Sequence, residues 1–276
     1  MEEWSVVHKV ALWGFLGAFL FGIIAHKTHF CTMGAISDWI NMGSLVRLRA
    51  WLLAIAVALL MSQLLQAMGW IDLSASIYLS TNFGIGGHIV GGLLFGVGMT
   101  LGGGCGQRTL VRAGGGNLKS LVVLLVLGLT AYITLRGLLA GVRIEVFGPL
   151  SIDLSEYGLV DQSLTGVVAA VSGLAPESVA KGLAVIIGLA LLIYTLKDKN
   201  FRTSGDGIAS GLVVGLLVAG AWFVTGVVGN DDFDPVRLET LTFIAPVGNM
   251  LNYLMTWTGS TIGFGIAVVF GVLAGS

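Results

Sequence analysis

Residues 86–112 of this chain, GGHIVGGLLFGVGMTLGGGCGQRTLVR, contain the feature that decides its fold. An apolar, glycine-rich segment runs directly into GGGCG at residues 102–106, where consecutive glycines favour a departure from helical geometry. Lipid cannot hydrogen-bond free peptide groups, so non-helical backbone at membrane depth persists only where protein buries it or where it lines a polar cavity. The thiol of Cys105 inside this break is therefore predicted to line a path through a membrane.

The composition places the rest of the chain in a membrane as well. Of the 276 residues, 55% are hydrophobic and 11% are charged, whereas soluble domains carry about 25% charged residues. The mean hydropathy is +0.93. A net charge of −1 argues against a nucleic-acid partner, and two cysteines exclude a disulfide framework as the basis of the fold.

Eight apolar segments approach the length of about 20 residues that a helix needs to cross the bilayer. They are residues 10–25, 50–68, 83–101, 121–141, 182–196, 208–228, 241–257 and 259–275. Several are short for a span, which indicates broken or partly penetrating helices, and residues 163–175 are predicted to form an interfacial or re-entrant piece. We therefore expect an all-α polytopic membrane protein with about eight transmembrane helices plus short broken or re-entrant ones.

Basic residues predict the orientation of these segments. Nine of the fourteen lysines and arginines fall in the loops that follow the first, third and fifth segments, and the segment after the sixth is acidic. This alternation predicts an extracytoplasmic N-terminus, with the loops around Cys31 and Cys105 near the cytoplasmic side of the membrane.

A faint internal repeat predicts the domain organisation. The order of helices in residues 1–145 restarts from the opposite side of the membrane at residues 211–217, GLVVGLL, as in inverted-topology repeats whose substrate site lies between the halves. We expect a first repeat over residues 1–145, an extracytoplasmic connector over residues 146–181, and a second repeat over residues 182–276. The second repeat lacks a glycine–cysteine break, so we expect a fragment of a longer protein or a partner that supplies the missing arm.

Cys105 lies where an anion would be stabilised. Amide N–H groups in a glycine run can turn inward to form an anion-binding nest, and a helix that begins near Thr109 would add its positive end. Arg108 and Arg112 supply nearby positive charge. A neutral thiol is a weak, polarisable donor that suits a soft, sulfur-bearing anion. The glycines expected to shape this cradle are Gly103, Gly104 and Gly106. The alternative is a small buried side chain at a tight helix junction.

Cys31 lies in a polar interruption, HKTHFCTMG, at residues 26–34. The spacing of His26, His29 and Cys31 does not keep all three on one helical face, and no second cluster completes four ligands, so we predict no metal and no cofactor. Cys31 is interpreted as a second thiol on the same path, or alternatively as a packed cysteine in an interfacial turn.

Three segments resemble the signatures of the YeeE/YedE family of inner-membrane sulfur-compound transporters. They are HFCTMGAI at residues 29–36, GGLLFGVGMTLGGGC at residues 91–105, and GQRTLVRAGGGNLKS at residues 106–120. The resemblance is specific over the first half of the chain. Past residue 182 it is mostly one of helix order and composition, with residues 241–276 matching best.

The resemblance implies two inverted repeats drawn into an hourglass, with Cys105 as the central thiol and Cys31 as a second one. It also implies a transporter, not an enzyme, that takes up thiosulfate through S–H···S contacts and delivers it to a cytoplasmic sulfurtransferase of the TusA or rhodanese type. Three alternatives stay open: a related selenium transporter, an intramembrane thiol enzyme that forms a cysteine persulfide, and a structural membrane subunit that only docks a sulfurtransferase.

Overall fold

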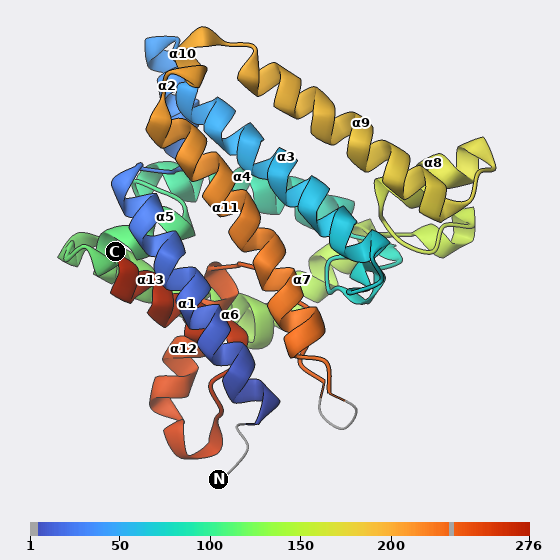
Figure 1. Ribbon diagram of the computed structural model, residues 1–276. Helices are drawn as coiled ribbons and strands as arrows, with labels where there is room; N and C mark the ends of the chain where they lie inside the picture. Colours follow the sequence, from blue (N-terminus) through green and yellow to red (C-terminus); the bar gives the residue numbers. More distant parts are fainter. Residues whose placement is uncertain (1–4, 232–234) are drawn as a thin grey trace.

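The protein is a bundle of tilted helices with one short pair of strands (Figure 1). The computed structural model describes residues 5–231 and 235–276. The helices are α1 (Val6–Lys27), α2 (Thr32–Met42), α3 (Val46–Ala67), α4 (Ile85–Leu101), α5 (Gly106–Gly114), α6 (Leu118–Arg136), α7 (Leu138–Phe147), α8 (Leu164–Ser172), α9 (Pro176–Leu196), α10 (Lys199–Arg202), α11 (Gly205–Phe223), α12 (Ile244–Met255) and α13 (Phe264–Gly275). Strands β1 (Asn82–Phe83) and β2 (Ile152–Asp153) pair antiparallel.

The predicted class is confirmed, since six helical segments of the described chain are long and apolar enough to cross a membrane. These segments are Val6–Met42, Val46–Ala67, Ile85–Gly114, Leu118–Arg136, Pro176–Leu196 and Gly205–Val228. The protein is therefore a multi-pass, all-α membrane protein. Helix α8 has nine residues and is too short to span, as expected for residues 163–175.

The expected number of about eight spans is too high, because the last two apolar segments form only the twelve-residue helices α12 and α13. Residues 235–243 and 260–263 have no regular secondary structure, and Trp257–Gly259 forms a single 3-10 turn. Side chains of Thr256 and Ser260 bond to backbone carbonyls at this turn, which offers the chain an alternative to helix. Apolar composition therefore identified the segments but overestimated their helical length.

Two helix pairs form the core, α1 with α13 and α3 with α11. Glycines permit the close approach in both pairs. A Cβ at Gly211 or Gly215 would lie 2.8 to 2.9 Å from carbonyl oxygens of α3, and a Cβ at Gly271 would collide with the carbonyl oxygen of Phe15 in α1. These glycines therefore serve helix packing.

Helix α4 differs from these pairs. It has no buried residue, and a Cβ at Gly87, Gly91, Gly92 or Gly96 would meet nothing within 4 Å. Although glycines at this spacing often let helices pack closely in membranes, these four contact no other helix within the part of the chain that the structure describes.

Three basic loops meet at one end of the bundle. Arg49 at the start of α3 forms an ion pair of 2.7 Å with Asp198, which caps α10, and α10 packs against α3. Arg108 of α5 contacts His29, which follows α1. The loops that the charge pattern assigned to one side of the membrane are thus neighbours.

Candidate functional site

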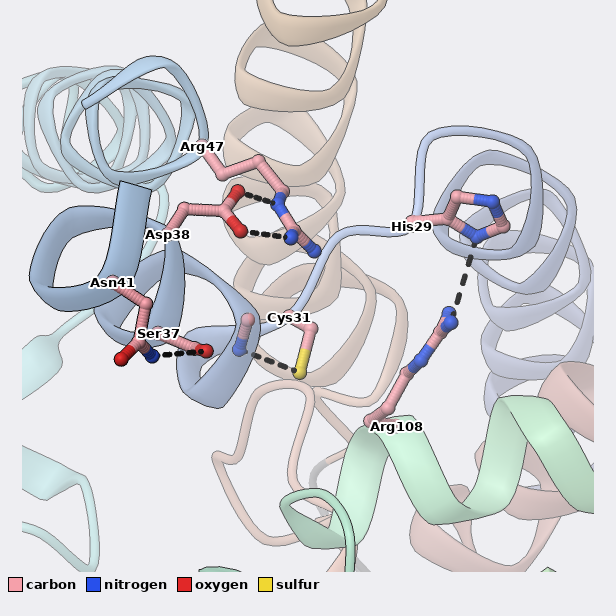
Figure 2. Close-up of polar contacts among 8 residues, drawn as sticks. His29, Cys31, Ser37, Asp38, Asn41, Arg47 and Arg108 are labelled. Carbon is pink, nitrogen blue, oxygen red and sulfur yellow. Dashed lines mark hydrogen bonds and ion pairs between the residues drawn. The ribbon is translucent and has the colours of Figure 1, made fainter. Parts of the chain in front are cut away.

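Both cysteines stand at the first turn of a helix. Cys105 precedes α5, and Cys31 precedes α2, where its Sγ accepts the backbone N–H of Gly34 at 3.4 Å (Figure 2). The chain reaches Cys31 through a turn in which His29 has a φ of 52°. Helix α5 begins at Gly106, three residues before the expected start near Thr109. The structure brings the two thiols, far apart in sequence, close enough to interact.

The glycine run closes α4 instead of forming an anion nest. Gly103 has a φ of 71°, and its N–H donates to the carbonyl of Thr100 at 3.3 Å. The N–H of Gly104 donates to the carbonyl of Met99 at 3.0 Å, which completes a Schellman motif. The expectation that Gly103 and Gly104 offer free amides to an anion is therefore wrong, because both amides are engaged with α4.

The free amides near the thiols belong to the first turns of α2 and α5, since the first N–H groups of a helix have no intrahelical acceptor. The backbone N–H groups of Thr32 and Arg108 face Cys105, and those of Met33 and Gly34 face Cys31. Gly106, which we expected to shape the cradle before the helix, is instead the first residue of α5. Two positive helix ends thus converge on one pair of sulfur atoms.

The two arginines near Cys105 have different surroundings. The guanidinium of Arg108 lies 3.5 Å from Nδ1 of His29, and its charge acts on Cys31 (Figure 2). Arg112 donates from Nη1 to the carbonyl of Gly103 at 3.2 Å. Arg108 therefore lies beside the Cys31 turn, whereas Arg112 bonds to the turn that ends α4.

Gln107 was missed by the sequence analysis, although it bridges the two cysteine turns. Its side chain is 8% exposed. Nε2 donates to the carbonyl of Phe30 at 3.2 Å, and Oε1 accepts the S–H of Cys105 at 3.8 Å. A polar residue two positions after a cysteine in a membrane helix was the available signal.

The thiol pair lies between two cavities. Cys105, Gly106 and Gln107 line a cavity of about 900 Å³ whose wall is mostly apolar, with Ser62 and Thr242 among its polar groups. Cys31 lines a second cavity of about 80 Å³. The other polar residues of this second cavity are Thr28, Arg47, Ser204, Asp206 and Ser210. Neither sulfur is packed only against aliphatic side chains.

A family model described as sulphur transport matches residues 27–276 of this chain. The chain belongs to this family. The resemblance to YeeE/YedE proteins is thereby confirmed.

Two relatives are each named thiosulfate transporter TsuA. The protein from Spirochaeta thermophila is 27% identical over 216 residues, which are 77% of this chain and 62% of the relative. The protein from Escherichia coli is 24% identical over 285 residues, which cover 97% of this chain and 74% of the relative. The match thus spans less than two thirds of the first relative's length.

In this sulphur transport family member, a partly buried ion pair supports the Cys31 turn. Both carboxylate oxygens of Asp38 bind the guanidinium of Arg47 (Figure 2). Arg47 also lies against Gly34, where a Cβ would come within 2.5 Å of Nη1. The pair therefore holds the first turn of α2 against α3, and the sequence analysis did not find it because the two residues meet only when the helices pack.

We expect Asp38→Asn to destabilise the folded protein by about 1–2 kcal/mol, because the variant leaves the Arg47 charge without its partner in a partly buried site. Thermal unfolding of the detergent-solubilised protein measures the effect. Glu177→Gln is the matched control, since it breaks an exposed ion pair with Lys181 and should leave the unfolding temperature unchanged. Equal unfolding temperatures for both variants would contradict a supporting role for the pair.

Proposed function

We propose that this protein carries a small sulfur-containing anion, thiosulfate above all, across the bacterial inner membrane. The observation that supports this most is the close approach of Cys31 and Cys105, with a large cavity on one side and a small one on the other. The family described as sulphur transport and the relatives named thiosulfate transporter agree with this proposal.

The geometry suits an anion with a soft sulfur end. Neutral thiols donate weak hydrogen bonds to a polarisable sulfur atom, and they do so here where two helix N-termini and Arg108 stabilise negative charge. Cys105 would receive the anion from the large cavity, and Cys31 would receive it next. The anion changes hydrogen-bond partners and keeps its own S–S bond, so passage needs no reductant.

Uptake of radiolabelled thiosulfate into membrane vesicles that contain the protein tests this proposal. We expect saturable uptake that excess unlabelled thiosulfate suppresses and that excess sulfate, which lacks the terminal sulfur, suppresses far less. Selenium-containing analogues belong in the same competition series. Uptake no faster than in vesicles without the protein would refute the proposal.

An intramembrane thiol enzyme is the competing function. In that reaction a cysteine thiolate attacks the terminal sulfur of thiosulfate, the S–S bond breaks, and a cysteine persulfide and sulfite form. We expect neither a mass increase of one sulfur atom on the protein nor release of sulfite after exposure to thiosulfate. A stable added sulfur together with sulfite would favour the enzyme.

We also propose the membrane organisation that the charge pattern indicates. Residues 1–145 and 182–276 would form two inverted repeats joined by an extracytoplasmic connector over residues 146–181, with the N-terminus outside. A reporter enzyme that works only outside the cytoplasm should be active when fused to the N-terminus.

A cytoplasmic sulfurtransferase of the TusA or rhodanese type would accept the anion. If such a sulfurtransferase did not co-purify with the solubilised protein in the presence of thiosulfate, this result would count against the partnership.

A further inference from the structure

We propose that Gln107 is a positioning residue that keeps the S–H donor of Cys105 available to the transported anion. The inference deepens the proposed function and rests on it for its transport consequence. Its structural part depends only on the hydrogen bonds of Gln107. This side chain is buried, touches Cys105, and lines the 900 Å³ cavity together with it.

The orientation of the amide follows from its partners. The carbonyl of Phe30 can only accept a hydrogen bond, so the atom of Gln107 that faces it must be the NH₂ group. The amide oxygen therefore faces Cys105, and the thiol must be the donor of that contact. Phe30 is itself buried, and its carbonyl lies in the turn between α1 and α2.

The S–H of Cys105 then has two acceptors within reach, Oε1 of Gln107 and Sγ of Cys31. An anion in the large cavity must replace one of these two acceptors to receive the hydrogen bond from the thiol. The contact with Gln107 is long, at 3.8 Å between Sγ and Oε1, and a charged acceptor forms the stronger bond. Gln107 therefore holds the donor weakly, which prevents the two thiols from bonding only to each other.

The same residue sets the distance between the thiol-bearing turns. Its bond to Phe30, the residue before Cys31, ties the first turn of α5 to the turn that precedes α2. Loss of this bond would leave a buried carbonyl without its partner and allow the two turns to separate. Gln107 thus controls both the direction of one thiol and the position of the other.

Gln107→Leu tests the proposal, because leucine fills a similar space without a donor or acceptor. We expect the KM for thiosulfate uptake to rise about tenfold, the equivalent of one to two lost hydrogen bonds, with a smaller change in the maximal rate. The infrared S–H stretching band of Cys105, isolated by subtracting the spectrum of Cys105→Ala protein, should move to higher frequency. Gln162→Leu is the matched control, since it removes the 2.7 Å hydrogen bond that Nε2 of Gln162 donates to the carbonyl of Tyr78, and neither residue belongs to a cysteine-bearing turn.

Gln107→Glu is the second variant. A carboxylate accepts a hydrogen bond more strongly than an amide, so the S–H band should move to lower frequency, while uptake falls because negative charge faces the anion. An S–H band that moves in neither variant overturns the inference, as does an unchanged KM in a normally accumulated Gln107→Leu protein. If Gln107→Leu protein fails to accumulate, the S–H band of Cys105 in Gln107→Glu protein decides whether the inference holds. Normal uptake by Cys105→Ala protein would instead refute the cysteine relay while leaving the band result interpretable.

Discussion

Replacement of Cys105 by alanine is expected to abolish thiosulfate-dependent growth in cells that rely on this protein for sulfur, and Cys31→Ala is expected to weaken it. Cys105 lies beside Cys31 and Gln107 and lines the large cavity, so its loss removes the thiol donor that this cavity offers to an anion. Alanine keeps the site compact, which leaves the fold intact. We expect the initial rate of thiosulfate uptake to fall at least about tenfold for Cys105→Ala and only a few-fold for Cys31→Ala.

The matched control is Ser120→Ala, another small buried residue, which lies on α6. It should grow and transport as the unmodified protein does. Protein levels in the membrane must be equal in all three variants for the comparison. Normal thiosulfate-dependent growth of Cys105→Ala cells would refute a thiol relay, whatever the behaviour of Cys31→Ala.

Gly271→Leu is expected to cause the largest loss of stability. Even a Cβ at this position would collide with the carbonyl oxygen of Phe15, because α13 lies directly on α1. Backbone atoms cannot swing away as a side chain can, so the two helices must separate. We expect a loss of about 3 kcal/mol or more, measured by thermal unfolding of the detergent-solubilised protein followed by circular dichroism.

Gly91→Leu on α4 provides the comparison for this variant. A Cβ at Gly91 meets nothing within 4 Å, and leucine favours helix more than glycine does. The unfolding temperature of Gly91→Leu protein should therefore equal or exceed that of the unmodified protein. If Gly271→Leu were as stable as Gly91→Leu, the close packing of α13 on α1 would be wrong.

Local sequence features were sufficient to predict much of this architecture. Runs of apolar residues identified the six membrane-spanning segments, because transfer from water to lipid depends on composition over a span's length. The glycines before Cys105 located the end of α4, because a helix often ends at a residue with positive φ. Gly103 has this conformation, which other residue types rarely adopt. The segments at residues 29–36, 91–105 and 106–120 were sufficient to identify the family, which the match over residues 27–276 confirms.

Other features could not be read from local sequence. Apolar residues in the last quarter of the chain predicted two full spans, but composition does not report where a helix ends, and α12 and α13 have twelve residues each. The glycine run predicted free amides, but the Schellman motif engages those of Gly103 and Gly104. Which amides face a ligand depends on the backbone dihedral angles of each turn.

The sequence by itself therefore determined that this is a helical membrane protein of the sulphur transport family with a broken helix at Cys105. Only the tertiary structure decided that Cys31 and Cys105 lie close together, that Gln107 joins their turns, and that Asp38 pairs with Arg47. Hydropathy determines whether a segment enters the membrane, and glycine content determines where its backbone can leave the helix. Both are properties of one segment, so they can be read without knowing its neighbours. Contacts between residues distant in the chain exist only after α1, α2, α3 and α5 have packed together.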